Sequence, residues 1–396
     1  AENAVSKQFA MYIFEKQTEC HLSDEQLKTH KDSFYTIFQK RWEIKIKGKV
    51  AAQRALISFL LSIQDQAILD QFKSLTQLVL DSTVEALKSD QQLGQQALES
   101  IVNLSQTHPQ FLKENISQLV KIISDIIKMK DFEEGTRSQA TEVVLTLAEQ
   151  VPATLRKEQT IKTEFYPALI QMLTECEEDM DTWTETVDDE FGTGNDIYST
   201  GISSIERLAV QMKEAVTLEA CGPVISQCLM HEDWKVRQAG FLASGLISES
   251  CKEHMKNNMD TAFNTACKGI QETIQESSMQ ASSASLTFGA IEAPSTKEVP
   301  RRTCPSPPLD INGADLAKIR TQAVHCLYQF TNGLIEEDKN EIDDTKKSSD
   351  IMMAYFDPLF KSLVENLTKA VDEKYEPMQE QVMNLLNASA TLIEEK

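Results

Sequence analysis

The sequence lacks several features that would place it in a familiar functional class. No apolar run approaches the roughly 18 residues that a membrane-spanning helix needs, and no signal peptide opens the chain. Its 13 glycines are few for 396 residues, and no stretch alternates apolar and polar residues for long, so strands are not expected. The eight cysteines are scattered and never spaced as C-x-x-C, which is typical of reduced thiols in a cytosolic or nuclear protein.

Positive charge is also scarce. The chain has 39 Lys and Arg residues against 61 Asp and Glu residues, which gives a formal net charge of −22. A nucleic acid is therefore not expected as a direct partner, because phosphate binding needs a cationic surface, and an anionic membrane surface is not expected for the same reason. An acidic surface attracts basic proteins instead.

The residues of a catalytic or metal site are not gathered in the sequence. The six histidines are dispersed, and Cys251 and His254 form a lone C-x-x-H, which is too few ligands for zinc. Gly192 and Gly194 form a G-x-G without a third glycine, so a dinucleotide site is not expected. The acidic segment around them lacks the residue order of a calcium loop. The sequence therefore predicts a protein that is not an enzyme and that holds no cofactor or metal.

Helical periodicity is easy to find. Residues 65–87 and 109–128 both place apolar side chains at steps of three and four, which puts them on one helix face. The fold class predicted from this pattern is all-α.

Seven segments align without gaps on a small anchor residue, at intervals of 42, 43, 61, 38, 42 and 42 residues. The anchors are Ala55, Ala97, Ala140, Gly201, Ala239, Ala281 and Ala323, with weaker copies at Ala10 and Val382. A period near 42 with two helices per period is typical of HEAT and armadillo repeats, and a small anchor lets helices cross closely. The sequence thus predicts a HEAT-repeat α-solenoid, a superhelix of stacked antiparallel helix pairs. An ordinary helical bundle with chance similarity is the alternative.

The unequal intervals predict the domain organisation. HEAT repeats are expected at 1–174, 197–275 and 314–396, with an acidic loop insertion at 175–196, an irregular segment at 276–313 and a charged loop at 336–350. Five of the eleven prolines lie in 276–313, and proline at this density cannot continue a helix. The repeat anchored at Ala281 is therefore expected to be degenerate or replaced by a loop, and a gene-model artefact would look the same.

The acidic insertion is the first candidate functional segment. No Lys or Arg occurs between Lys162 and Arg207, whereas ten acidic residues lie between Glu175 and Asp196, with Trp183 among them. This composition favours a docking loop for Lys/Arg-rich partners, in which Trp183 stacks on a cation or its alkyl stem. A solvated acidic linker that only aids solubility is the alternative.

Polar residues on the second helix of each pair are the other candidates. If these helices line a concave face, their carboxylates can pair with the Lys or Arg of a basic cargo peptide, and their amides can hold its backbone. The candidates are Glu99, Asn103, Glu142, Glu206, Asn332, Asn384 and Asn387. An ordinary solvated helix face is the alternative for each.

Three stretches resemble a known family. They read PALIQMLTECEEDMDTWTETVDDEF (167–191), ISSIERLAVQM (202–212) and HEDWKVRQAGFLASGLISESC (231–251). They are similar to the importin-beta (karyopherin-beta) nuclear transport receptors, above all the importin-5 or importin subunit beta-3 type. The resemblance runs from about residue 5 to the end and is most specific at 165–255. It implies an interior fragment of a longer protein, beginning near the third or fourth repeat.

The resemblance implies a monomeric receptor that shuttles between cytoplasm and nucleus through the nuclear pore. Such a receptor binds basic cargo (nuclear localisation signals, ribosomal proteins or histones) on its concave face, releases it when RanGTP binds, and contacts phenylalanine-glycine nucleoporins on its convex side. By motif match, a cargo or Ran contact falls on Glu177, Glu178, Asp179, Asp181, Trp183, Asp188, Asp189 and Glu190.

The same resemblance assigns Asp233 and Arg237 to a structural ladder between neighbouring repeats. Two departures from the family pattern bear on function. The first repeats, which carry the principal Ran surface, are absent from this sequence, so a Ran response is expected of the full-length protein. The proline-rich run also replaces the family's usual segment after residue 270. The alternative function is a HEAT scaffold subunit of a multiprotein complex without transport activity.

Overall fold

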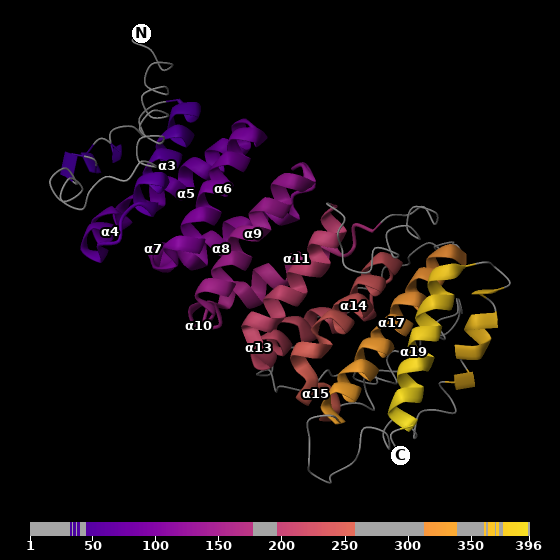
Figure 1. Cartoon of the computed structure of the whole chain (residues 1–396). Coiled ribbons are helices and arrows are strands. Elements are labelled where there is room, and N and C mark those ends of the chain that lie inside the picture. Colours follow the sequence, from indigo (N-terminus) through magenta and orange to yellow (C-terminus); the bar gives the residue numbers. More distant parts are fainter. Residues whose placement is uncertain are drawn as a thin grey trace, which may run out of the picture. The chain divides into compact units, whose positions relative to one another are not determined.

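The computed structural model describes most of the repeat-bearing chain. The described residues are 45–176, 196–257, 313–338 and 375–394, with individual positions in 32–39 and most of 360–371. Within these ranges every regular element is a helix, which confirms the predicted all-α class (Figure 1). The acidic residues 177–195, the proline-rich segment, the charged loop at 339–350 and the weak anchor Ala10 lie outside the described residues.

The chain divides into two compact units, residues 1–168 and 169–396. The helices of the first unit, in chain order, are α3 (Ile46–Leu61), α4 (Gln66–Phe72), α5 (Thr76–Ser89), α6 (Gln91–Thr107), α7 (Pro109–Leu112), α8 (Ile116–Lys128), α9 (Glu134–Gln150) and α10 (Pro152–Leu155). Two 3-10 turns, η1 (Lys73–Leu75) and η2 (Lys113–Asn115), and the π-helical turn η3 (Ile161–Phe165) complete it. The helices predicted over 65–87 and 109–128 are confirmed, each broken once by a 3-10 turn.

The helices of this unit form the predicted pairs. The first helices α5 and α8 pack on the second helices α6 and α9, and α3, α6 and α9 pack on one another in sequence order (Figure 1). The anchors Ala55, Ala97 and Ala140 are fully buried where these helices meet. A larger side chain there would push the helix axes apart, which explains the small residue at each repeat.

Hydrogen bonds between successive second helices repeat this spacing. The Gln91 side-chain oxygen accepts from the Glu133 backbone N–H at 2.8 Å, and Gln95 Nε2 donates to Thr136 Oγ1 at 2.9 Å. The partners are 42 and 41 residues apart in the chain, so the contacts join equivalent positions of neighbouring repeats.

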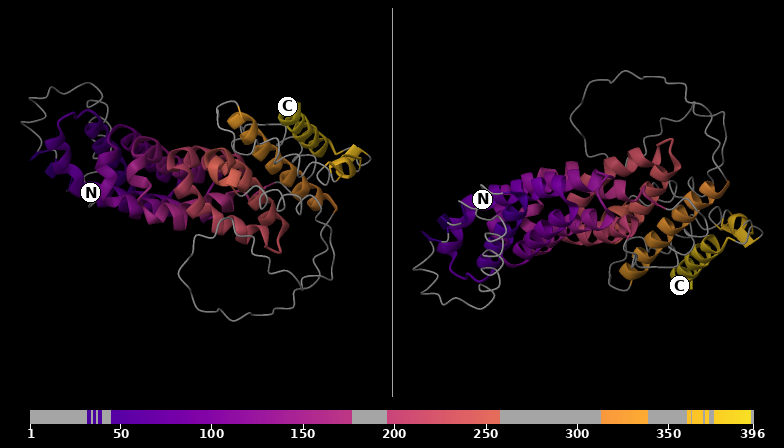
Figure 2. Two further views of the ribbon diagram at one scale, coloured as in Figure 1. Left: turned by 90° about the horizontal axis from the view of Figure 1, so that it is seen from below. Right: turned by 90° about the horizontal axis from the view of Figure 1, so that it is seen from above.

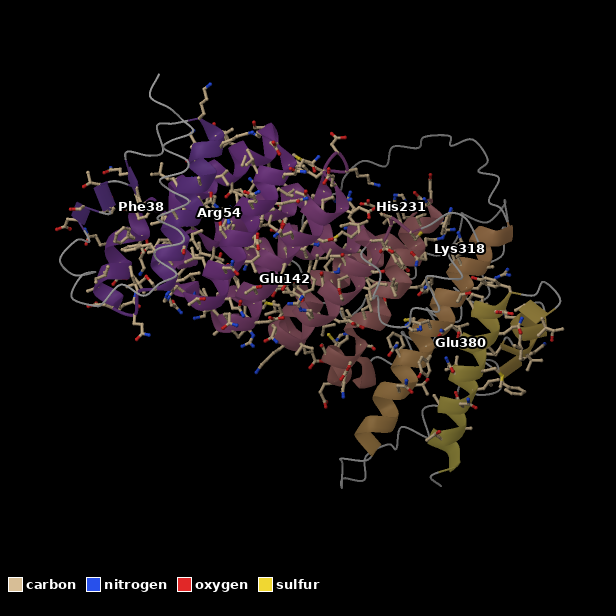
Figure 3. All side chains as sticks on the ribbon, turned by 45° about the horizontal axis from the view of Figure 1, so that its top comes forward. Phe38, Arg54, Glu142, His231, Lys318 and Glu380 are labelled. Atoms are coloured by element: carbon tan, nitrogen blue, oxygen red, sulfur yellow. The ribbon has the colours of Figure 1, made fainter. Side chains whose placement is uncertain are left out.

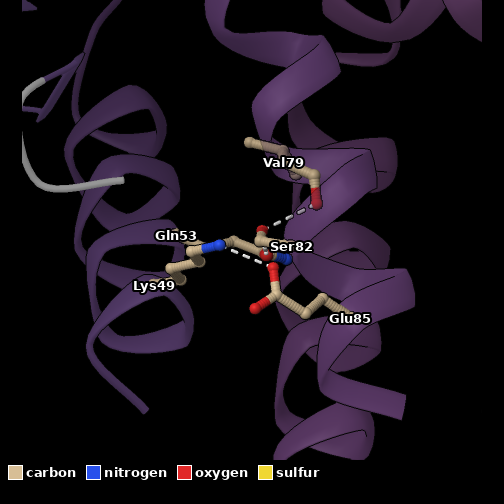
Figure 4. A network of polar contacts seen from close by, with 5 residues as sticks. All are labelled: Lys49, Gln53, Val79, Ser82 and Glu85. Carbon is tan, nitrogen blue, oxygen red and sulfur yellow. Dashed lines mark hydrogen bonds and ion pairs between the residues drawn. The ribbon is translucent and has the colours of Figure 1, made fainter. Parts of the chain in front are cut away.

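A buried polar cluster fastens α3 to α5 and α6. The Gln53 amide is fully buried, and its Nε2 lies 3.0 to 3.1 Å from Thr83 Oγ1, Ser100 Oγ and the Ala97 carbonyl oxygen. Its Oε1 accepts from Ser82 Oγ at 2.6 Å, and Lys49 pairs with Glu85 beside it at the surface (Figure 4). A buried amide with all its groups bonded fixes the register of the three helices.

The second unit contains α13 (Ile197–Leu229), α14 (Trp234–Ser248), the 3-10 turn η4 (Glu249–Cys251), α15 (Lys252–Asn257), α17 (Gly313–Asp338) and α19 (Glu376–Glu394). The short helix α11 (Tyr166–Met172) spans the division between the units. Helix α13 consists of two helical halves that meet at Lys213. Its first half is the second helix of one pair, and its second half is the first helix of the next.

Helices α13, α14, α17 and α19 pack on one another in that order, and α17 lies beside α19 in both views of Figure 2. The buried anchors Gly201, Ala239, Ala323 and Val382 lie on these helices. Each unit is therefore a stack of HEAT-type helix pairs, an α-solenoid.

Helices α14 and α17 are neighbours although they lie far apart in the chain. Helix α14 packs directly on α17, although residues 258–312 separate α15 from the described part of the next repeat. Helix α15 also packs on α17. The expectation that the repeat anchored at Ala281 is degenerate or replaced by a loop concerns residues outside the described ones, so it stays a prediction.

Candidate functional site

The candidate carboxylates of the first unit occupy matching positions on neighbouring second helices. Glu99 and Glu142 each follow a buried anchor by two residues, Ala97 on α6 and Ala140 on α9, and these two helices pack together. Glu99 is exposed and Glu142 half-buried, with Thr146 Oγ1 3.4 Å from Glu142 Oε1 (Figure 3). Two carboxylates thus lie one repeat apart on one side of the helix stack.

The other candidate on α6, Asn103, lies one turn after Glu99 and is exposed. Since residues four apart share a helix face, Asn103 extends the same polar surface along α6. An amide beside a carboxylate offers both a donor and acceptors to a peptide backbone.

Glu206 is the candidate of the second unit, and its surroundings are acidic. Its side chain reaches solvent, yet partial burial and the nearby Glu249 carboxylate raise the pKa of Glu206. Glu206 lies on α13 and Glu249 opens the turn η4 directly after α14, so the pair joins neighbouring repeats. Two carboxylates that repel each other create a place where a cation is stabilised. Sequence reasoning missed Glu249, although it follows Glu206 by 43 residues, about one repeat.

The asparagine candidates are divided between α17 and α19. Asn384 is half-buried two residues after Val382, the position that Glu99 and Glu142 hold in their repeats, and Asn387 is exposed three residues further on. Asn332 is half-buried but lies nine residues after its anchor, on a different turn of α17.

The residue of α17 at the matching position is His325, which sequence reasoning missed. Its Nδ1 lies 3.0 Å from Gln381 Oε1 on α19, so the side chain links the two helices.

The predicted docking residues of the acidic segment, Glu177 to Glu190 with Trp183, lie outside the described residues. The residues at its two ends are described. Asp196 caps α13, because its carboxylate accepts from the Ser199 backbone N–H at 2.6 Å. Cys176 is buried at the other end, and this burial raises the pKa of its thiol while the nearby Lys235 and Lys318 ammonium groups oppose the rise.

These two lysines belong to a cluster that the sequence did not reveal. Trp234 opens α14, and its ring centroid lies 5.1 Å from Lys318 Nζ and 5.8 Å from Lys235 Nζ. Lys318 is fully buried on α17 (Figure 3). A buried ammonium over an aromatic ring is a cation–π contact, and it ties α14 to α17 next to the start of the acidic segment.

Asp233 and Arg237, predicted to form a ladder, both stabilise the turn that precedes α14. Asp233 caps the helix by accepting from the Lys235 backbone N–H at 2.9 Å. Arg237 Nη1 donates to the carbonyl oxygens of His231 and Glu232 at 2.8 and 2.7 Å. In the first unit Arg137 Nε donates in the same way to the Ile127 carbonyl. A ladder between neighbouring repeats stays a prediction.

Within the part of the chain that the structure describes, no group of three or more His, Cys, Asp or Glu side chains could hold a metal ion. None of the described helices combines the length and apolar character of a membrane span.

Comparison with known proteins places these observations in a family. The family described as "IPO5-like, TPR repeats" matches residues 1–122, and the family described as "Importin repeat" matches residues 129–218. The two matches together cover more than half of the chain. The chain belongs to the importin-beta family.

Individual relatives agree with this family. Importin subunit beta-3 of Saccharomyces cerevisiae is 22% identical over 158 residues, which are 39% of this chain and 14% of that protein. The structure of Kap121p bound to Ste12p matches all of this chain with a TM-score of 0.67 and 16% identity, and that of Kap121p bound to RanGTP matches 88% with a TM-score of 0.60 and 16% identity. At this identity the likeness concerns the fold.

The importin-beta chain described here spans only part of these proteins. It covers 37% of the Kap121p chain bound to Ste12p and 33% of the one bound to RanGTP. A further similar structure is a Kap121p variant in which three acidic residues are replaced by lysine. It has a TM-score of 0.65 and 16% identity, and matches all of this chain and 37% of that one.

Proposed function

We propose that this chain is the cargo-binding part of a nuclear import receptor, and that carboxylates on its second helices bind Lys/Arg-rich segments of cargo. The observation that carries the proposal is that carboxylates recur on neighbouring repeats. Glu99 and Glu142 hold matching positions on the packed helices α6 and α9, and Glu249 lies close enough to Glu206 to raise the pKa of that carboxyl. A carboxylate once per repeat can pair with the basic side chains of an extended peptide that runs across the helices.

Charge and family support this proposal. The net charge of −22 attracts basic proteins at long range. Kap121p, a similar protein, has been solved bound to Pho4p, to Ste12p, to RanGTP and to Nup53p. We extend these kinds of partner to the full-length receptor: basic cargo such as ribosomal proteins or histones, Ran as the release factor, and nucleoporins during shuttling between cytoplasm and nucleus.

The asparagines take a supporting part in the proposal. Asn103, Asn384 and Asn387 would hold the cargo backbone next to the carboxylates, because an amide both donates and accepts. Asn332 is the weakest member of the set, since it lies on a different turn of its helix.

The experiment compares two double variants of equal charge change. Glu99→Gln/Glu142→Gln removes two carboxylates from the second helices, and Asp81→Asn/Glu114→Gln removes two exposed ones from the first-helix segments. Binding of a fluorescent ribosomal-protein tail is measured at two salt concentrations. Since each exposed pair contributes roughly 0.2–1 kcal/mol, the first variant should weaken binding by about 2- to 30-fold and the second by much less.

Equal losses in the two variants would show that only net charge matters, and the proposed site would be wrong. If the chain binds neither the ribosomal-protein tail nor phenylalanine-glycine peptides, the scaffold function is favoured instead. Circular dichroism of each variant checks that helicity is unchanged.

We further propose that the acidic segment contributes to cargo or Ran binding through Glu177, Glu178, Asp179, Asp181, Trp183, Asp188, Asp189 and Glu190. The support is its composition and its family likeness. Replacing Asp179, Asp181, Asp188, Asp189 and Glu190 together by their amides should weaken tail binding, most strongly at low salt. Unchanged binding would remove this segment from the site.

A further inference from the structure

Lys213 has an unusual backbone conformation. Its φ is 65° and its ψ 164°, and among the described residues it is the one non-glycine residue with a positive φ. It lies where the two halves of α13 meet without a connecting loop. In this region a Cβ atom crowds the neighbouring backbone, so the conformation is nearly restricted to glycine and is strained in a lysine.

Equivalent junctions in the first unit are not strained. His108 joins α6 to α7 with φ −131° and ψ 60°, and Val151 joins α9 to α10 with φ −134° and ψ 53°. Each is followed by a proline at the first position of the next helix. The chain thus passes from one helix pair to the next at His108 and Val151 with negative φ values. The positive φ of Lys213 must therefore be maintained by contacts with its surroundings.

One contact holds the junction from the neighbouring repeat. Glu214 Oε1 accepts from the backbone N–H of His254 at 2.6 Å, 40 residues further along the chain. His254 lies on α15, in the next repeat of the stack. Met212, two residues before Glu214, and Cys251, three residues before His254, are both fully buried. Burial and the nearby Glu214 carboxylate raise the pKa of the Cys251 thiol to about 12.

We propose that Lys213 and Glu214 form a strained latch between neighbouring repeats of the second unit. Backbone strain at Lys213 favours opening of the junction, and the bond from His254 to Glu214 keeps it closed. Opening frees the second half of α13 to turn relative to its first half and to α15, so the latch is a point where the curvature of this helix stack changes.

Hydrogen exchange of the full chain tests the latch at the His254 amide. Glu214→Ala removes the acceptor and should speed exchange at His254 by about tenfold or more, whereas Glu214→Gln keeps an acceptor oxygen and should retain most protection. Lys213→Gly relieves the strain and should slow exchange there by roughly tenfold. Lys213→Ala removes the same charge but keeps a Cβ, so it should exchange like the original chain.

Equal exchange in Lys213→Gly and Lys213→Ala would show that no strain is stored at this residue. Unchanged exchange in Glu214→Ala would show that the carboxylate holds nothing closed. Either result overturns the latch. If Glu214→Ala fails to fold, the two Lys213 variants and Glu214→Gln still decide the question. None of these measurements uses a cargo peptide, so their outcome does not depend on the proposed function.

Discussion

The two units stack their second helices by different means. In the first unit, α3 and α6 are joined through the buried polar cluster at Gln53, and their helix pairs follow one another closely in the chain. In the second unit, α14 and α17 meet at small residues, and residues 258–312 separate α15 from α17. A Cβ atom at Gly245 would lie 3.5 Å from Cys326 Cα, so the two helix backbones approach closely.

This difference teaches that matching helix surfaces, rather than a short connection, determines which helices become neighbours. The entropic cost of closing a loop grows only slowly with its length, so a long segment between two helices need not prevent their packing. The surface of α14 is shaped for two neighbours: a Cβ at Gly240 would lie 3.0 Å from Cys228 Cβ on α13, and Gly245 faces α17.

The strongest way to break the second interface is Gly245→Leu. Its side chain would have to enter the space between α14 and Cys326, and overpacking of this kind costs about 3 kcal/mol. We expect a lower melting temperature and faster hydrogen exchange in α17 and α19 than in α6 and α9. Differential calorimetry and hydrogen exchange measure the two effects.

Gly245→Ala is the matched control. A Cβ 3.5 Å from its nearest neighbour is in ordinary van der Waals contact, and alanine favours the helix by up to about 1 kcal/mol over glycine. The alanine variant should therefore be as stable as the original chain or slightly more so. If the two variants have the same melting temperature, Gly245 is not required for the close approach of α14 and α17.

The polar interface of the first unit is tested by Gln53→Leu, which keeps the volume and removes the hydrogen bonds. Ser82 and Thr83 can still donate to the Val79 carbonyl oxygen, so only part of the cluster loses its partners. We expect a loss of about 2 kcal/mol, since buried polar groups left unpaired cost about 1–3 kcal/mol. Urea unfolding followed by circular dichroism measures the change.

The exposed Gln77, which bonds to Asp81 at 2.8 Å, supplies the control for Gln53. Gln77→Leu should change stability by less than about 0.5 kcal/mol, because solvent replaces the lost bond. A Gln53→Leu protein that is as stable as the Gln77→Leu protein would contradict the role given to the buried cluster.

The sequence could reveal the repeats because their signal is local. Small anchors recur at a fixed interval, and every anchor within the described residues is buried as expected. A local interval could not show which repeats become neighbours, however. Helix α14 packs directly on α17, although the anchors Ala239 and Ala323 are 84 residues apart.

The site was harder to predict because its residues are defined by contacts across repeats. Glu99 and Glu142 could be chosen from their position after an anchor, but Glu249 becomes relevant only because α14 lies beside α13. The contact of Trp234 with Lys318 joins α14 and α17 through two residues that are 84 positions apart in the sequence. No period in a sequence shows which side chains meet over such a separation.

The smallest expected effect concerns Glu206. Its pKa is raised in the folded chain by burial and by Glu249, so folding favours the protonated form. The free energy of unfolding of the original chain therefore falls as the pH rises through the folded pKa of Glu206. This loss is absent at a pH below about 4.3, the pKa of a glutamate in an unfolded chain. Because the side chain reaches solvent, the effect at pH 7 should be a fraction of 1 kcal/mol.

Glu206→Gln should thus be slightly more stable than the original chain at pH 7 and equally stable near pH 4, as measured by thermal unfolding across that range. Glu249→Gln should give a smaller gain, because it removes the repulsion but leaves the partial burial of Glu206. The double variant should gain less than the sum of the two, since only one repulsion exists to be relieved. Additive gains would mean that the two carboxylates do not face each other, and the second unit would then lose its proposed binding pair while that of the first unit stands.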